Sequence, residues 1–137
     1  MSNPASAQDR PTVEHYGNPA LNGQPLPFSR AVRVGDVVYL SGAIGRGPDG
    51  KPPEGIEAQT LAVFHNVRLV LEDAGASWED IVDVTVFLTD MKADFPTFNR
   101  LYAKHFATNR PTRTTVEVGA LPTPICVELK VIAYVKP

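Results

Sequence analysis

The sequence lacks most features that identify a disulfide-bonded or membrane-spanning protein at first inspection. Cys126 is the only cysteine in 137 residues, which excludes an intrachain disulfide and a cysteine-based zinc site. No apolar run approaches the roughly 20 residues needed to span a bilayer. The start of the chain has no apolar core of the kind that signal peptides carry. The cytoplasm is therefore the expected compartment.

A strong charge excess and the common catalytic motifs are also missing. The formal net charge is −2 and the pI is about 5.9, so neither nucleic acid nor a membrane surface is expected as a partner. The motifs GxxxxGK[ST], HExxH and GxSxG do not occur. His15, His65 and His105 are dispersed and are expected to be surface or boundary residues. No metal site and no cofactor is predicted.

What the sequence does contain is apolar periodicity typical of an α+β domain. Strands are expected at 31–34, 37–40, 81–90, 112–119 and 125–135, and helices at 57–74 and 93–107. The first two strands flank a Gly35–Asp36 turn, which predicts a hairpin. The order ββαβαββ indicates a mostly antiparallel sheet with two helices on one face.

The start of the chain has a different composition from the rest. Residues 1–27 are rich in Pro, Asn, Gly, Ser and Gln, which favour turns and loops. We therefore expect a flexible N-terminal segment over 1–27 and a single domain over 28–137.

The last strand has one apolar and one mixed row of side chains. The apolar row is Val127, Leu129, Val131, Ala133 and Val135, and the mixed row is Cys126, Glu128, Lys130, Ile132 and Tyr134. A mixed sheet face that includes large apolar side chains is typical of a surface that pairs with another subunit. An oligomer is therefore predicted.

Arg113 and Glu128 are the charged residues that the strand pattern makes most informative. On composition alone they are a cross-strand pair at the sheet surface. However, if residues 116–128 close as a hairpin, Glu117 lies near Glu128. Arg113 then lies four residues further along, about 13 Å away. The two side chains then either belong to separate sites or meet only across a subunit interface. An arginine can hold a carboxylate by two parallel hydrogen bonds.

Three segments resemble the RidA/YjgF family of imine and enamine deaminases. They are "PFSRAVRVGDVVYLSGAIG", "AGASWEDIVDVTVFLTDMKADFPTFNRLY" and "PTRTTVEVGALPTPICVELKVIA". The resemblance spans about 110 residues, from Phe28 to the end of the chain. The resemblance implies the trimeric, chorismate-mutase-like RidA sandwich, with a homotrimer whose sites lie between subunits.

The resemblance also implies roles for individual residues. Arg113 matches the arginine that binds the substrate carboxylate, and Glu128 matches the acid linked to the catalytic water. The substrate-binding positions are Phe28, Ser41, Gly42, Asn99 and Thr115. Phe28 stands where many members have tyrosine, and Thr115 where many have cysteine.

The activity implied by the resemblance is hydrolysis of reactive 2-imino or 2-enamino acids to 2-keto acids and ammonia. Three alternatives stay open. One is a non-catalytic, ligand-binding or chaperone-like trimer. Another is a deaminase of a longer amino-dienoate such as 2-aminomuconate. The third is an RNA-directed activity, which the acidic pI disfavours.

Overall fold

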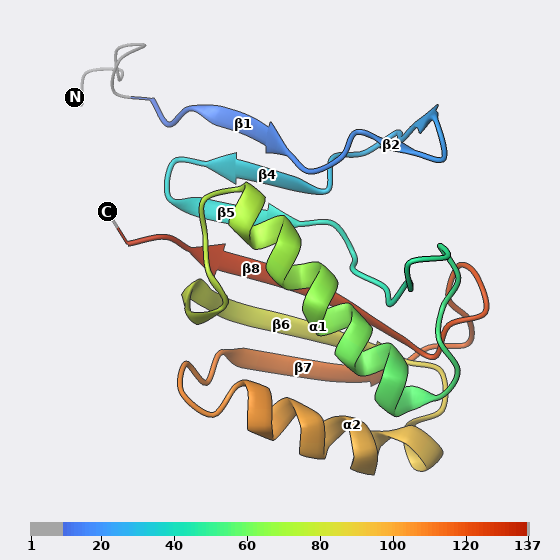
Figure 1. Cartoon of the computed structure of the whole chain (residues 1–137). Coiled ribbons are helices and arrows are strands. Elements are labelled where there is room, and N and C mark those ends of the chain that lie inside the picture. Colours follow the sequence, from blue (N-terminus) through green and yellow to red (C-terminus); the bar gives the residue numbers. More distant parts are fainter. Residues whose placement is uncertain (1–9, 137) are drawn as a thin grey trace.

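A six-stranded sheet forms the centre of the protein, and both long helices cover one of its faces (Figure 1). The computed structural model describes residues 10–136. In sheet order, the strands are β1 (Val13–Tyr16), β4 (Ala31–Val34), β5 (Val37–Leu40), β8 (Val127–Tyr134), β6 (Ile81–Leu88) and β7 (Thr112–Glu117). A small second sheet pairs β2 (Ala20–Leu21) with β3 (Gln24–Pro25). The predicted α+β fold, with order ββαβαββ from β4 onward, is confirmed.

The two long helices begin and end where local sequence signals place them. Helix α1 (Ile56–Asp73) stops before Gly75, whose φ of 79° is the left-handed conformation that commonly ends a helix. Helix α2 (Met91–His105) is capped by Asp90, whose side chain accepts a hydrogen bond from the Ala93 N–H at 3.0 Å. A short 3-10 helix, η1 (Trp78–Asp80), precedes β6. No helix within residues 10–136 is long and apolar enough to cross a membrane.

The core lies between the sheet and the helices. Alternate residues of β6 and β8 are fully buried there: Val84, Val86, Leu88, Val127, Leu129, Val131 and Ala133. The β8 residues among them belong to the apolar row predicted for the last strand, whereas Val135, the last residue predicted in that row, lies beyond β8 and is only partly buried. The opposite row of β8 lies on the face that no helix covers, where Tyr39 is 43% exposed and Tyr134 is 44% exposed. The mixed face is therefore an open face of the sheet.

The last two strands do not form the hairpin that was considered for residues 116–128. Strand β6 lies between them, parallel to β7 and antiparallel to β8. The physical reason is the β6–α2–β7 connection, because a strand that follows a crossover helix returns parallel to its predecessor. Residues 118–126 then carry the chain past β6 to β8.

The expectation that residues 1–27 contain only flexible turns and loops is wrong for β1. Val13–Tyr16 pair antiparallel with Val34–Ala31, and Tyr16 packs against the core. The Gly17 N–H also donates to Asp73 Oδ2 at 2.6 Å, which ties this segment to the end of α1. The sheet therefore begins before residue 28. Residues 1–9 lie outside the described residues.

Candidate active site

Arg113 lies on the helix-covered side of β7, in contact with α2. Its Nη1 donates to Asn99 Oδ1 at 2.8 Å, and its Cζ lies 4.6 Å from the centre of the Tyr102 ring. The Phe95 ring centre is 5.7 Å away. One hydrogen bond and two aromatic contacts thus orient the guanidinium, and most of its five N–H donors remain free.

The pairing of β7 with β6 and the hydrogen bonds from β7 to α2 fix this arrangement. Arg113 is the register partner of Val84 on β6, so both side chains lie on the same face. At the other end of β7, Glu117 Oε1 accepts the Met91 N–H at 2.9 Å, where a carboxylate complements the helix N-terminus. Strand and helix are therefore joined at both ends of the Arg113 site.

Two buried hydroxyls beside Arg113 have no hydrogen-bond partner within residues 10–136. They belong to Thr115, which is two residues further along β7, and to Tyr102. Burial raises the pKa of Tyr102 to about 12, and the nearby Arg113 charge opposes that rise. Tyr102 is therefore a neutral phenol at physiological pH, and its ring face carries the guanidinium. We call Asn99, Tyr102, Arg113 and Thr115 the guanidinium site.

Glu128 lies elsewhere, on the open face of β8 opposite Phe87. Burial raises the pKa of its carboxyl group, because losing water disfavours the charged form. A Cβ built on Gly42 would lie 2.9 Å from Glu128 Oε1, so the absence of a side chain at Gly42 makes room for the carboxylate. The Glu128 carboxyl group therefore lies directly against the backbone of Gly42.

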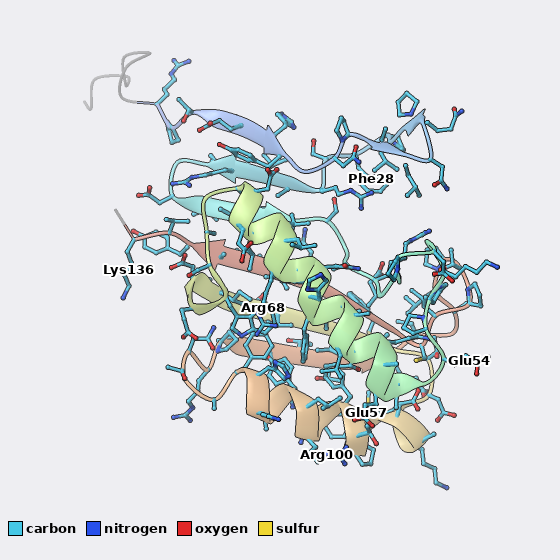
Figure 2. All side chains as sticks on the ribbon, in the orientation of Figure 1. Phe28, Glu54, Glu57, Arg68, Arg100 and Lys136 are labelled. Carbon is cyan, nitrogen blue, oxygen red and sulfur yellow. The ribbon has the colours of Figure 1, made fainter. Side chains whose placement is uncertain are left out.

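Glu128 and Gly42 line a cavity of about 610 Å³, together with Phe28 and Ser41. We call it the Glu128 cavity. Figure 2 shows Phe28 near the β2–β3 hairpin, on the opposite side of the molecule from α2, and its side chain is 51% exposed. The Ser41 hydroxyl donates to the Ser29 carbonyl at 2.5 Å. The hydroxyl proton of Ser41 is therefore already used in a hydrogen bond, whereas the hydroxyl oxygen can still accept one.

The structure thus separates the sequence-predicted residues into two groups. Asn99, Arg113 and Thr115 are in the guanidinium site, whereas Phe28, Ser41, Gly42 and Glu128 are in the Glu128 cavity. On the sheet, Arg113 is two strands and three residues from Glu128, about 14 Å between Cα atoms. Their side chains also lie on opposite faces. A cross-strand pair within one chain is therefore excluded.

Sequence reasoning missed several neighbours of these groups. The helical spacing of the aromatic residues within 93–107 places Tyr102 in the core, where the structure has it, but does not show its contact with Arg113. Its position three residues after Asn99 was the available signal, since such residues share a helix face. Arg30 and Arg46 also line the Glu128 cavity, although nothing in the strand pattern singled them out.

The structure shows neither a dinucleotide-binding loop nor a metal-binding cluster in the described part of the chain. The glycines of residues 45–50 match the spacing GxGxxG, but α1 begins only at Ile56, so this loop does not open a helix as a dinucleotide-binding loop does. Among residues 10–136, no group of three or more His, Cys, Asp or Glu side chains is placed to hold a metal ion.

Comparison with known proteins places this chain and its fold in one class. The family model described as Endoribonuclease L-PSP matches residues 23–135. The chain therefore belongs to this family, which is the RidA/YjgF family predicted from the sequence.

The relatives cover most of the chain. A RutC family protein of Saccharolobus solfataricus is 44% identical over 109 residues, which are 78% of this chain and 86% of the relative. Reactive Intermediate Deaminase A of Arabidopsis thaliana is 37% identical over 135 residues, 97% of this chain and 70% of the relative. The crystal structure of yeast Mmf1 has a TM-score of 0.82 at 39% identity, and the match covers 91% of this chain and all of that one.

Proposed function

We propose that the protein hydrolyses reactive 2-imino and 2-enamino acids to 2-keto acids and ammonia. The observation that carries this proposal is the orientation of Arg113 by Asn99 and Tyr102, with most of its N–H donors free. Such a guanidinium matches the planar carboxylate shared by all these substrates. The similarity to a relative named Reactive Intermediate Deaminase A supports the same chemistry.

Glu128 is the group proposed to move protons. As a water oxygen attacks C2 of the imine, the Glu128 carboxylate takes one proton from that water. It returns this proton to the nitrogen, which gives a carbinolamine. It then takes the hydroxyl proton and passes it to the amino nitrogen, so the C–N bond breaks and ammonia is released. The carbon becomes a ketone, and one water is consumed for each ammonia formed. A carboxyl group whose pKa is raised toward neutrality is suited to both transfers.

A homotrimer is proposed because neither group of residues is complete within one chain. The Arg113 and Glu128 side chains lie on opposite faces of the sheet, so a neighbouring subunit is needed to place both around one substrate. The open face supports this assembly, since Tyr39, Tyr134 and the 37%-exposed Val116 all lie on it. A cytoplasmic location and independence from metals and cofactors are parts of the same proposal.

The test is a coupled assay in which an enzyme generates 2-aminoacrylate and semicarbazide traps the resulting imine. We expect the protein to lower semicarbazone formation in proportion to its concentration and to sediment at three times the 14.9 kDa chain mass. Binding of 2-keto acids without imine consumption would contradict the proposal and favour the non-catalytic trimer. Salt-sensitive RNA cleavage without imine consumption would favour the RNA-directed alternative.

A further inference from the structure

The Glu128 cavity has a charge balance opposite to that of the whole protein. Its charged lining residues are Arg30, Arg46 and Glu128, a net charge of +1, whereas the chain carries −2. Arg30 precedes β4, and Arg46 lies in the loop after β5. Two cations from separate segments therefore line one cavity.

Neither arginine is neutralised by a carboxylate in the described part of the chain. Arg30 Nε donates to the Asn18 carbonyl and Arg46 Nη1 to the Gly50 carbonyl, both at 3.2 Å. The single ion pair within residues 10–136 joins Arg33 and Asp36. Because a guanidinium has five N–H donors, each of the two retains donors for a ligand.

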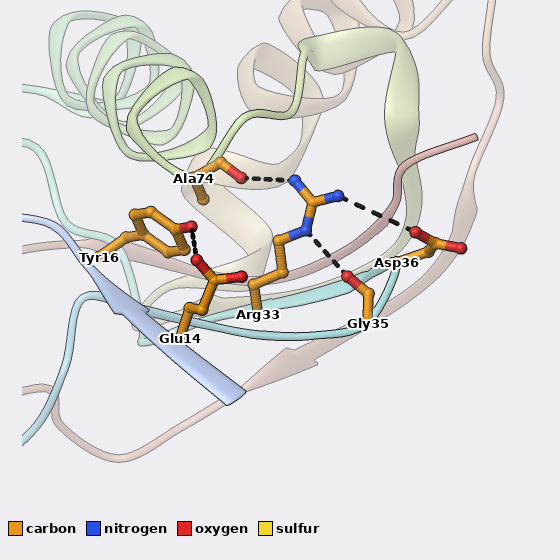
Figure 3. Close-up of polar contacts among 6 residues, drawn as sticks. All are labelled: Glu14, Tyr16, Arg33, Gly35, Asp36 and Ala74. Atoms are coloured by element: carbon orange, nitrogen blue, oxygen red, sulfur yellow. Dashed lines mark hydrogen bonds and ion pairs between the residues drawn. The ribbon is translucent and has the colours of Figure 1, made fainter. Parts of the chain in front are cut away.

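Arg33 shows how this chain uses an arginine for structure alone. Its Nε donates to the Gly35 carbonyl at 2.9 Å and its Nη1 to the Ala74 carbonyl at 3.0 Å, while its Nη2 lies 3.9 Å from Asp36 Oδ1 (Figure 3). All three nitrogens have a partner. Arg30 and Arg46 each have one, which distinguishes them from a structural arginine.

Both cavity arginines are also held in place. Arg30 packs against Gly17, where an added Cβ would lie 2.5 Å from the Arg30 Cβ. Arg46 belongs to a closed loop in which the Gly47 N–H donates to the Lys51 carbonyl at 2.8 Å. Both side chains are half-buried. A cation that is already positioned loses less conformational entropy when it binds an anion.

We infer that the Glu128 cavity selects imino and enamino acids whose side chain ends in a second carboxylate, bound by Arg30 or Arg46. The inference rests on the proposed function, in which Arg113 of a neighbouring subunit holds the first carboxylate. The apolar lining, which includes Leu26, Leu40 and Leu69, suits the carbons between the two acid groups. The substrate class is therefore the dicarboxylic 2-imino acids.

The experiment compares two imines of equal carbon number, 2-iminoglutarate and 2-iminopentanoate, each generated in the assay by an amino acid oxidase. We expect the wild-type kcat/KM to favour 2-iminoglutarate by about tenfold or more, because a charge-assisted hydrogen bond contributes about 1.5–3 kcal/mol. In the double variant Arg30→Gln/Arg46→Gln, this preference falls at least about tenfold, while kcat/KM for 2-iminopentanoate stays within about twofold.

Arg100→Gln is the matched control, since it removes the same charge from an exposed position on α2, far from Phe28 (Figure 2). Its two kcat/KM values should equal those of the wild type. A wild-type preference for 2-iminopentanoate, or an unchanged preference in the double variant, overturns the inference and leaves the deaminase proposal intact.

A binding measurement separates the two ideas if neither imine is consumed. Calorimetry with 2-oxoglutarate and 2-oxopentanoate, the corresponding products, should then show tighter binding of the dicarboxylate that the double variant loses. That result would end the deaminase proposal and support the selectivity of the cavity. Equal binding of both keto acids would overturn the inference as well.

Discussion

Arg113 in the guanidinium site and Glu128 in its cavity are opposite charges in different kinds of surroundings. Arg113 is an exposed cation fixed by contacts with α2, whereas Glu128 is a partly buried acid against the bare backbone of Gly42. Contacts orient the first group, and loss of water changes the proton affinity of the second. Under the proposed function, Arg113 binds the carboxylate shared by all the substrates and Glu128 transfers protons.

Removing the cation should have the largest effect. Arg113→Ala deletes about two charge-assisted hydrogen bonds to the substrate, which is about 3 kcal/mol and a loss of about 100-fold or more in kcat/KM. The semicarbazide assay measures this loss, and sedimentation should show an unchanged oligomer because Arg113 is not a core residue. Arg100→Ala, on the same helix-covered side, should retain wild-type activity. Wild-type activity in Arg113→Ala would remove the role assigned to this side of the molecule.

Removing the Glu128 carboxylate should lower activity nearly as much as removing the Arg113 guanidinium, but the two changes should affect stability differently. Glu128→Gln loses the proton-transfer group, worth about 100-fold in kcat. Since the carboxylate is the base, wild-type kcat/KM should fall as pH drops through the raised pKa of Glu128, and Glu128→Gln should lack that acid limb.

The same variant should lose activity but gain thermal stability at pH 7. Because the folded state raises the pKa of Glu128, it binds this proton more tightly than the unfolded chain does, and the stability so gained is lost as pH rises through the folded pKa. Glu128→Gln should therefore raise the melting temperature slightly at pH 7 and leave it unchanged near pH 3. A lower melting temperature at pH 7 would show that the carboxylate stabilises the fold instead.

Gly42→Ala tests whether the position of Glu128 matters as well as its charge. The added Cβ would lie 2.9 Å from Oε1 and 3.0 Å from the carboxyl carbon, so the end of the Glu128 side chain must move. We expect a loss of about tenfold in kcat with little change in melting temperature, because a misplaced catalytic group slows reaction without unfolding the chain. Unchanged kcat would mean that the carboxylate position is not critical.

The sequence predicted the elements of the two sites better than their arrangement. Alternation along residues 127–133 correctly identified the core row, and three- and four-residue spacing identified both helices. The position of β6 between β7 and β8 depends on the crossover through α2, a long-range property that alternation within one strand does not contain. Strand β1 was missed because its four residues, in a segment bounded by Pro11 and Gly17, are too few to show a period.

The two-sided site shows a similar limit. Family resemblance supplied Arg113 and Glu128, and strand spacing indicated that they do not meet within one chain. Their opposite faces follow from the strand register. Arg113 pairs with Val84 and Glu128 with Phe87, and these two β6 residues are an odd number of positions apart, so their side chains point to opposite faces. Tyr102 was placed in the core without a role, because helical spacing assigns a face of the helix and not the strand residue that rests on it.

Tyr102 gives the smallest and most specific test of the guanidinium site. Its hydroxyl is buried without a partner, so Tyr102→Phe should leave KM unchanged and keep or slightly raise the melting temperature. Tyr102→Leu removes the ring beneath Arg113, and a cation–π contact of about 0.5–1 kcal/mol predicts a KM about two- to fivefold higher at nearly constant kcat. Only the leucine variant also weakens packing, because it loses the stacking on the Phe106 ring, whose centre lies 4.3 Å from that of Tyr102. A merely structural role would lower the melting temperature of Tyr102→Leu without changing KM, whereas restoration of KM by phenylalanine alone assigns the ring to the orientation of Arg113.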